Sequence, residues 1–470
     1  MDIFQVYLFF VLKILFFEKI GNIMSEKKLK WGFIQPLIGG AYFGAEAAIG
    51  CPADWILSFP GMCSHREKDG EIRACANEYH LMKYLQKKNA LPPYLTIDRE
   101  MFAECKNDPN AFNPEFIKNE FSTADHIDLS NMDLVCALPV CSGLSNATTT
   151  HNNETRIARN QNMQWITEYV LRIIKPKAYI FENAPALFAG TKGKPIREYI
   201  NKIADENGYS VSYFKTDTML HHNAQRRPRT FVICWKWHDG KRQMPPALNF
   251  VNDPMSIKDF FAEMPKYEHN EVVPLLYDNK AALEYVKMTH PDDWRKTLND
   301  MSAYAHIVQN DEVDAYIAFC ETYRFDTDKQ RAQCISQIKH AKEKYDAGSW
   351  IFDTKPRTID DTGTLPTIMH KNTVAILHPY EERLLSIGEM LYCMGMPSDF
   401  RVYGGWYEKM HHIGQNVPAK TMQYIVSEIV RVLKNWDVER NNTNGNPFFG
   451  DDANVEYVDN IKQTCSTKVE

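Results

Sequence analysis

The sequence lacks the cysteine pairs that mark zinc ribbons and disulfide frameworks. Its 11 cysteines are odd in number, scattered and never spaced as Cys-x-x-Cys. We therefore predict no metal ligands, no disulfides and a reduced, cytoplasmic protein. The sequence also has no internal repeats. Its residues are 44% apolar and 24% charged, which is the usual composition of a globular protein. This composition excludes collagen-like, coiled-coil and disordered proteins.

Excess positive charge is absent as well, which removes the simplest electrostatic argument for nucleic-acid binding. The formal net charge is -6 at pH 7. Residues 436–470 contain seven acids and three bases, so this segment contributes -4 and the remaining chain is close to neutral. A neutral body can still carry a local basic groove. The same segment is rich in Asn, Gly and Asp without any period, and it is predicted to be a flexible acidic tail.

Long hydrophobic runs are nearly absent. The strongest, residues 3–17, has about fifteen residues, is interrupted by Lys13 and is too short for a comfortable membrane span. Asp2 stands where a signal peptide would carry positive charge. Met24 opens a polar segment typical of a cytoplasmic start. We therefore interpret residues 1–23 as an upstream extension or a wrongly chosen start, and we predict no membrane association.

Apolar segments that suit strands alternate with segments of helical period. Strands are predicted within residues 31–40, 54–59, 133–139, 178–183 and 229–237, and helices within 41–50, 71–88, 163–176, 195–209, 383–400 and 420–433. This alternation predicts an α/β fold, a doubly wound and mostly parallel sheet with helices on both faces. Residues 266–356 lack the rhythm and are predicted to form a smaller domain inserted between residues 24–265 and 357–435 of the main domain.

Four short segments lie at the carboxyl ends of predicted strands, where open α/β sheets hold their ligands. Gly39 and Gly40 form a turn between a strand and a helix. Such a pair either lets the backbone approach a ligand or only closes a tight turn. Cys141, in Pro-Val-Cys-Ser-Gly-Leu-Ser, follows a buried strand. It is either a partly exposed thiol of lowered pKa or a structural cysteine.

The other two segments carry charged groups. Glu182 and Asn183 end the strand of Phe-Glu-Asn-Ala-Pro-Ala-Leu. A carboxyl group in that place is partly desolvated, which raises its pKa and suits it to proton transfer, although a helix cap is the alternative. Three arginines, including Arg227 and Arg229, precede the next strand in Gln-Arg-Arg-Pro-Arg. Their planar donors suit a carboxylate, a phosphate or a base edge, and a solvated charge cluster is the alternative.

The order and spacing of these segments resemble one family, the cytosine-C5 DNA methyltransferases. That family has a Pro-Cys loop, a Glu-Asn-Val strand end about forty residues later and a Gln-x-Arg-x-Arg motif about forty residues further. It also has a glycine-rich S-adenosylmethionine loop near its start and a Gly-Asn-x-Val-Pro segment near its end. The resemblance covers roughly residues 31–433 except 266–356, as expected for a variable target-recognition domain.

The resemblance implies a Rossmann-like methyltransferase that uses S-adenosylmethionine and acts on double-stranded DNA. Cys141 would attack C6 of a flipped-out cytosine, and Glu182 would hold or protonate N3. Arg227 and Arg229 would orient Glu182 and contact the cytosine O2. Asn183 matches the Asn of Glu-Asn-Val.

For the cofactor, the resemblance implies contacts from several segments of the chain. The expected residues are Gly39, Gly40, Glu78, Asp125, Pro139, Asn416 and Val417. Asp125 matches the Asp that the family uses for the adenine amine. Glu78 is the candidate for the ribose, although it is predicted in the interior of helix 71–88. Four positions depart from the usual Phe, Gly, Pro and Val of the motifs, namely Gln35, Leu37, Val140 and Ala184.

Three functions remain open from the sequence. The leading hypothesis is a DNA (cytosine-5-)-methyltransferase, and the alternatives are a catalytically inactive DNA-binding relative and an RNA cytosine-C5 methyltransferase. Retention of Cys141, Glu182 and the arginines together argues against an inactive copy. An insertion of about ninety residues favours DNA, because sequence is read by side chains placed in a groove. We expect a monomer, and a cognate restriction endonuclease stays open as a partner.

Overall fold

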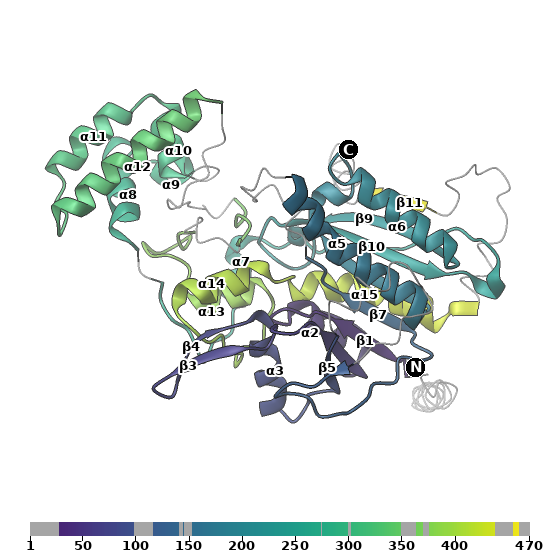
Figure 1. Ribbon diagram of the computed structural model, residues 1–470. Helices are drawn as coiled ribbons and strands as arrows, with labels where there is room; N and C mark the ends of the chain where they lie inside the picture. The colour runs from purple at the N-terminus through teal and green to yellow at the C-terminus, as the bar shows by residue number, and fades with distance from the viewer. Residues whose placement is uncertain are drawn as a thin grey trace, which may run out of the picture.

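A computed structural model describes residues 28–97, 116–140, 144, 153–273, 275–298, 302–348, 363–369, 376–437 and 455–459. The expected extension at 1–23, Cys141 and most of the C-terminal segment lie outside these ranges. The described part consists of a central sheet with helices on both faces and a group of helices set apart from the sheet (Figure 1).

A nine-stranded sheet has the order β11-β9-β10-β8-β7-β1-β2-β5-β6. Its strands are β1 (Trp31–Ile34), β2 (Trp55–Ser58), β5 (Tyr94–Ile97), β6 (Phe116–Ile117), β7 (Leu134–Ala137), β8 (Ala178–Asn183), β9 (Tyr209–Asp217), β10 (Pro228–Lys236) and β11 (Val455–Asp459). The five central strands β8, β7, β1, β2 and β5 are parallel, and β10 runs antiparallel to both of its neighbours. The predicted doubly wound, mostly parallel sheet is therefore confirmed.

The strand order reverses beside β1. After β1 the chain moves outward through β2 and β5, and it then returns to place β7 on the other side of β1. The loops that follow β1 and β7 therefore lead to helices on opposite faces of the sheet. The carboxyl edge at such a reversal is where an open α/β sheet binds its ligand.

Helices cover both faces because successive strand residues point to opposite sides. Trp31 and Phe33 point to one face, and Ile34 points to the other. The first face is covered by α2 (Gly40–Ile49), α3 (Asn77–Lys87) and α15 (Ala419–Lys434). The second is covered by α5 (Asn153–Tyr169), its continuation η1 (Val170–Ile174) and α6 (Lys194–Glu206). The C-terminal α15 thus packs on the same face of the sheet as α2 and α3.

The prediction of one helix over residues 71–88 was wrong. Residues 71–75 form β4 (Glu71–Cys75), which pairs antiparallel with β3 (His65–Lys68), and α3 begins only at Asn77. Asp69 and Gly70 both have positive φ, 54° and 74°. An Asp-Gly pair in this conformation is the preferred two-residue hairpin turn, and it competes successfully with the helical spacing of the apolar residues. Glu78 consequently lies in the first turn of α3 and not in a helix interior.

Residues 277–346 form a helical group on the far side of the return helices (Figure 1). Its helices are α8 (Tyr277–Thr289), α9 (Trp294–Thr297), α10 (Ala303–Gln309), α11 (Val313–Thr322) and α12 (Asp328–Asp346). Three further helices lie between this group and the sheet, namely α7 (Ile257–Ala262), α13 (Ile387–Cys393) and α14 (Trp406–Gln415). Among the residues that the structure describes, none of the helices has the length and apolarity needed to cross a bilayer.

Candidate active site

The glycine turn after β1 has an unusual backbone. Gly39 has φ 107° and precedes the first residue of α2, and a Cβ on it would lie 2.6 Å from a Leu81 methyl carbon. Gln35 and Leu37 also have positive φ, 59° and 55°. A left-handed conformation costs a non-glycine residue about 1–2 kcal/mol, and such strain gathers where function requires a particular geometry. The Leu37 position therefore keeps a conformation that suits glycine although the glycine of the family motif is absent.

Asn416 and Val417 hold this turn from the C-terminal side. The Gly40 N–H donates to Asn416 Oδ1 over 2.9 Å. A Cβ on Gly40 would lie 2.2 Å from the Val417 carbonyl oxygen, so only glycine permits this approach. The Asn416 side chain is fully buried, and its Nδ2 lies 3.2 Å from Met396 Sδ. The contact joins the start of α2 to a segment nearly four hundred residues later.

Glu78 returns to the carboxyl edge because the β3–β4 hairpin is an insertion between β2 and α3. Its side chain is fully buried, and Tyr94 of β5 donates to its Oε2 over 3.1 Å. Burial raises the pKa of Glu78 to about 8, and the hydroxyls of Tyr94 and of Ser58, the last residue of β2, oppose that rise. The other carboxylate oxygen is buried without a hydrogen-bond partner in the described structure.

Glu182 and Arg229 are brought together by strand pairing. Because β10 is antiparallel to β8, its first residues lie beside the last residues of β8, with Thr230 opposite Asn183. Arg229 Nε lies 2.6 Å from Glu182 Oε1, and both side chains are largely buried. Burial raises the pKa of Glu182, and the positive charges of Arg229 and Arg227 oppose this shift. The net shift therefore favours the protonated carboxyl group more than at an exposed glutamate.

Arg227 has different partners. Its two terminal nitrogens donate to the carbonyl oxygens of Ile368, Gly414 and Asn416 over 2.6, 2.9 and 2.7 Å. The residue is 2% exposed. Arg227 therefore ties the start of β10 to the closing segment, while its charge still acts on Glu182.

The loop that carries Cys141 starts beside Glu182. Ala137 of β7 lies opposite Phe181 of β8, so the residues that follow each strand leave at the same edge of the sheet. Pro139 is buried, and the Val140 N–H donates to Asn162 Oδ1 of α5 over 2.9 Å. Asn162 was not among the expected site residues, and no motif in the sequence distinguishes it.

Asn183 and Asp125 complete the expected set. Asn183 is fully buried, its Oδ1 accepts from the Ala184 N–H over 2.9 Å, and its Nδ2 has no partner among the described residues. The Asp125 side chain is 83% exposed and forms an ion pair with Lys118. The structure thus groups the glycine turn, Glu78, Pro139, Glu182 and the arginines at one edge, with Asp125 on the surface.

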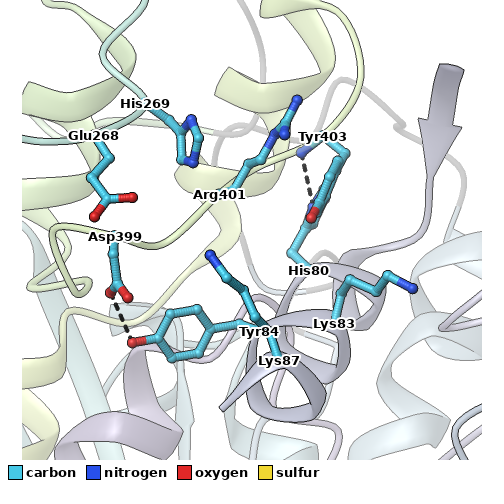
Figure 2. A pocket seen from close by; sticks show the side chains of 9 residues that line it. All are labelled: His80, Lys83, Tyr84, Lys87, Glu268, His269, Asp399, Arg401 and Tyr403. Atoms are coloured by element: carbon cyan, nitrogen blue, oxygen red, sulfur yellow. Dashed lines mark hydrogen bonds between the residues drawn. The ribbon is translucent and has the colours of Figure 1, made fainter.

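A cavity of about 360 Å³ lies elsewhere, between α3 and residues 397–403. Figure 2 shows Lys83, Lys87 and Arg401 around it, together with Asp399, which accepts from Tyr84. None of the expected site residues lines this cavity. The cavity does not mark the active site, because the conformational strain and the buried carboxyl groups lie at the sheet edge.

The chain was compared with known proteins. The family described as C-5 cytosine-specific DNA methylase matches residues 103–431. A protein of Methanocaldococcus jannaschii, provisionally named a type II methyltransferase, is 37% identical over 68 residues. That match covers 14% of this chain and 21% of the relative, so the chain matches about a fifth of the curated relative's length.

Two solved structures resemble the chain over most of its length. One is a prophage-encoded protein of Escherichia coli, provisionally titled a DNA modification methyltransferase, with 15% identity and a TM-score of 0.47. The comparison covers 86% of this chain and 99% of that chain. The other is the Entamoeba histolytica methyltransferase EhMeth, with 10% identity, a TM-score of 0.46 and coverage of 88% and 99%. These likenesses are too distant to carry an argument about activity.

Proposed function

The chain belongs to the C-5 cytosine-specific DNA methylase family, and from this premise we propose that it transfers a methyl group from S-adenosylmethionine to C5 of a flipped-out cytosine in duplex DNA. The observation that carries the proposal is the buried Glu182–Arg229 pair beside the start of the Cys141 loop. A buried carboxyl group, a cation that orients it and an adjacent cysteine loop are what covalent activation of a pyrimidine requires.

Cytosine C5 is a poor nucleophile, so the proposed reaction begins at C6. The Cys141 thiolate forms a bond to C6, and the C5–C6 π electrons become available at C5. Glu182 carries the proton that N3 shares, which neutralises the negative charge arising on the ring. After transfer, a water molecule accepts the C5 proton, the C–H electron pair re-forms the C5–C6 double bond, and the C6–S bond breaks to release the Cys141 thiolate.

The groups at the glycine turn fit the cofactor. Glu78 offers a buried carboxylate oxygen without a partner, which suits the two hydroxyls of a ribose. Gly39, with its positive φ, and Gly40 shape the turn at the start of α2, where we propose that the cofactor binds. The cofactor supplies an electrophilic methyl group when bound. Asp125, whose side chain is exposed, would reach the adenine amine only from the rim of the site.

Covalent trapping tests the proposal. A duplex in which 5-fluorocytosine replaces cytosine should form a stable adduct with the parent protein, because fluorine at C5 cannot leave as the proton does. Cys141→Ala should form no adduct and lose transfer almost completely. An RNA hairpin with the same base is the comparison substrate, and we expect it to be inactive.

Cys136→Ala is the matched control. Cys136 lies five residues earlier on β7, is fully buried, and its burial raises the thiol pKa. This variant should still be trapped, and Cys141→Ala should still bind S-adenosylmethionine in calorimetry. An adduct that persists in Cys141→Ala, or that maps to another cysteine by peptide mass, contradicts the mechanism.

A further inference from the structure

Two histidines and a glutamate meet inside the helical group. His290 ends α8, His306 lies on α10, and Glu312 stands just before α11. One ligand atom from each residue lies within 4.8 Å of those of the other two. Three separate segments of the insertion therefore point potential metal ligands at a common point.

The distances suit a divalent metal ion. The Nε2 atoms of His290 and His306 are 3.1 Å apart. A tetrahedral zinc with Zn–N bonds of about 2.0–2.1 Å would hold two imidazole nitrogens about 3.4 Å apart. Glu312 Oε2 is buried and has no hydrogen-bond partner in the described structure. A buried carboxylate oxygen without a partner is costly, and coordination would remove that cost.

Outer contacts hold the three side chains in place. His290 Nδ1 lies 3.9 Å from Asp293 Oδ1, on the ring side opposite to the cluster. The Tyr285 hydroxyl hydrogen-bonds the Glu312 carboxylate. The Asn310 side-chain amide faces the His306 ring, with its nitrogen 3.0 Å from Nδ1 and 3.4 Å from Nε2. Unlike a backbone N–H, this amide can turn so that its oxygen accepts from Nδ1–H, which leaves Nε2 unprotonated for a metal ion. A carboxylate behind a histidine is the usual outer partner of a metal ligand.

We propose that His290, His306 and Glu312 bind one Zn²⁺ ion, which fastens α8, α10 and the start of α11 together. Two imidazoles and a carboxylate are ligands that zinc accepts, with water in the remaining position. The site does not depend on methyl transfer. The sequence showed no metal motif because the ligands are neither cysteines nor closely spaced, and only the packing of three helices collects them.

A second cluster, Cys75, His80 and His412, is the weaker candidate. Its three ligand atoms also lie within 4.8 Å of one another. However, His80 Nδ1 accepts the Tyr403 N–H over 3.1 Å. A neutral imidazole that accepts at Nδ1 carries its proton on Nε2, the atom 3.4 Å from Cys75 Sγ. This cluster is therefore satisfied as a hydrogen-bonded pair.

Metal titration of the full chain tests the site. After treatment with a chelator, the parent should bind one Zn²⁺ per chain in calorimetry, and its melting temperature should rise with zinc. The Co²⁺ form should show visible d–d bands without a near-ultraviolet thiolate charge-transfer band. Glu312→Gln should weaken zinc binding by at least about 100-fold, and Asp293→Asn by about 10–100-fold.

Two features keep the test decisive. Asp293 is 61% exposed, so its conservative variant should fold even if Glu312→Gln does not. His340→Gln, an exposed histidine of α12 beside Glu343, is the matched control and should bind zinc as the parent does. Undiminished zinc affinity in Asp293→Asn, a charge-transfer band that disappears in Cys75→Ser, or no zinc binding by the parent would each overturn the proposal.

Discussion

The carboxyl edge of the sheet and the helical group at residues 277–346 are held together in different ways. At the sheet edge, Glu182 and Arg229 lie beside each other because two adjacent strands end there. In the helical group, Tyr285, Tyr304 and Tyr316 fill a core of rings in edge contact. The first region holds a buried ion pair at the ends of paired strands, and the second packs its helices around an apolar core.

The difference shows which region must hold its side chains in fixed positions. Chemistry requires groups fixed to within a fraction of an ångström, and strands buried on both faces supply that rigidity. Recognition of a sequence requires a surface whose side chains can vary while the core beneath it stays packed.

Replacing Glu182 with Gln should give the largest effect and would show that the sheet edge carries the chemistry. Gln keeps the shape but cannot deliver a proton to N3, so turnover should fall by about 10²–10⁴. Glu206→Gln, a surface residue paired with Arg172, is the control and should retain activity. Steady-state methylation of duplex DNA measures both, and near-parental turnover in Glu182→Gln would assign the proton to another group.

Substituting the two arginines one at a time should affect stability and turnover differently. Arg227→Gln removes donors from three carbonyl oxygens, each worth about 1.5–3 kcal/mol to a charged donor, so the free energy of unfolding should fall by about 3 kcal/mol or more. Arg229→Gln should cost less stability, because Glu182 can take up a proton, but it should lower turnover. Urea unfolding and turnover should be measured on both, and equal losses of stability would refute the assignment.

Stability should depend on pH through Glu78. Its pKa in the folded protein is about 8, above the unfolded value of about 4.3. The folded state therefore holds this proton more tightly, and the stabilisation, complete below about pH 4, is lost as the pH rises through 8. Without cofactor, the parent should lose about 3–4 kcal/mol relative to Glu78→Gln between about pH 5 and pH 8. The free energies of unfolding of the parent and of Glu78→Gln should be measured in urea across this pH range. If the two change with pH in parallel, the pH dependence does not come from Glu78.

Exchanging residues 266–356 for the matching region of a relative should change turnover less than the substitutions at the sheet edge do. The methylated sequence should move to that of the donor if base readout resides in the insertion, as we propose. Turnover at the new site should stay within about tenfold, since no catalytic group is exchanged. Bisulfite sequencing of DNA from expressing cells reports the site, and an unchanged site would place recognition elsewhere.

Much of the sheet was predictable because its signals are local. The segments 178–183 and 229–237 each contain a short continuous apolar run, and the structure places β8 and β10 there within one residue. The hairpin β3–β4 was missed although Asp69-Gly70 is its turn signal, because the apolar spacing of residues 71–88 also fits a helix. In that segment a two-residue turn decided what periodicity left ambiguous.

The sequence offered candidate site residues but not their contact partners. The motifs identified Arg227 and Arg229 as a pair with one role. The fold gives them separate roles, since Arg229 contacts Glu182 while Arg227 binds carbonyls far along the chain. Contacts between distant segments leave no local pattern, so sequence reasoning could not separate the two.

The sequence by itself determined the family, the order of the motifs and the mostly parallel sheet, because each rests on residues close together in the chain. The tertiary structure decided where Glu78 lies, since a hairpin separates it from β2 and folding brings it back to Ser58. It also decided that His290, His306 and Glu312 meet. Both outcomes depend on packing between segments, and packing follows from the shape and burial of whole elements, which no short stretch of sequence encodes.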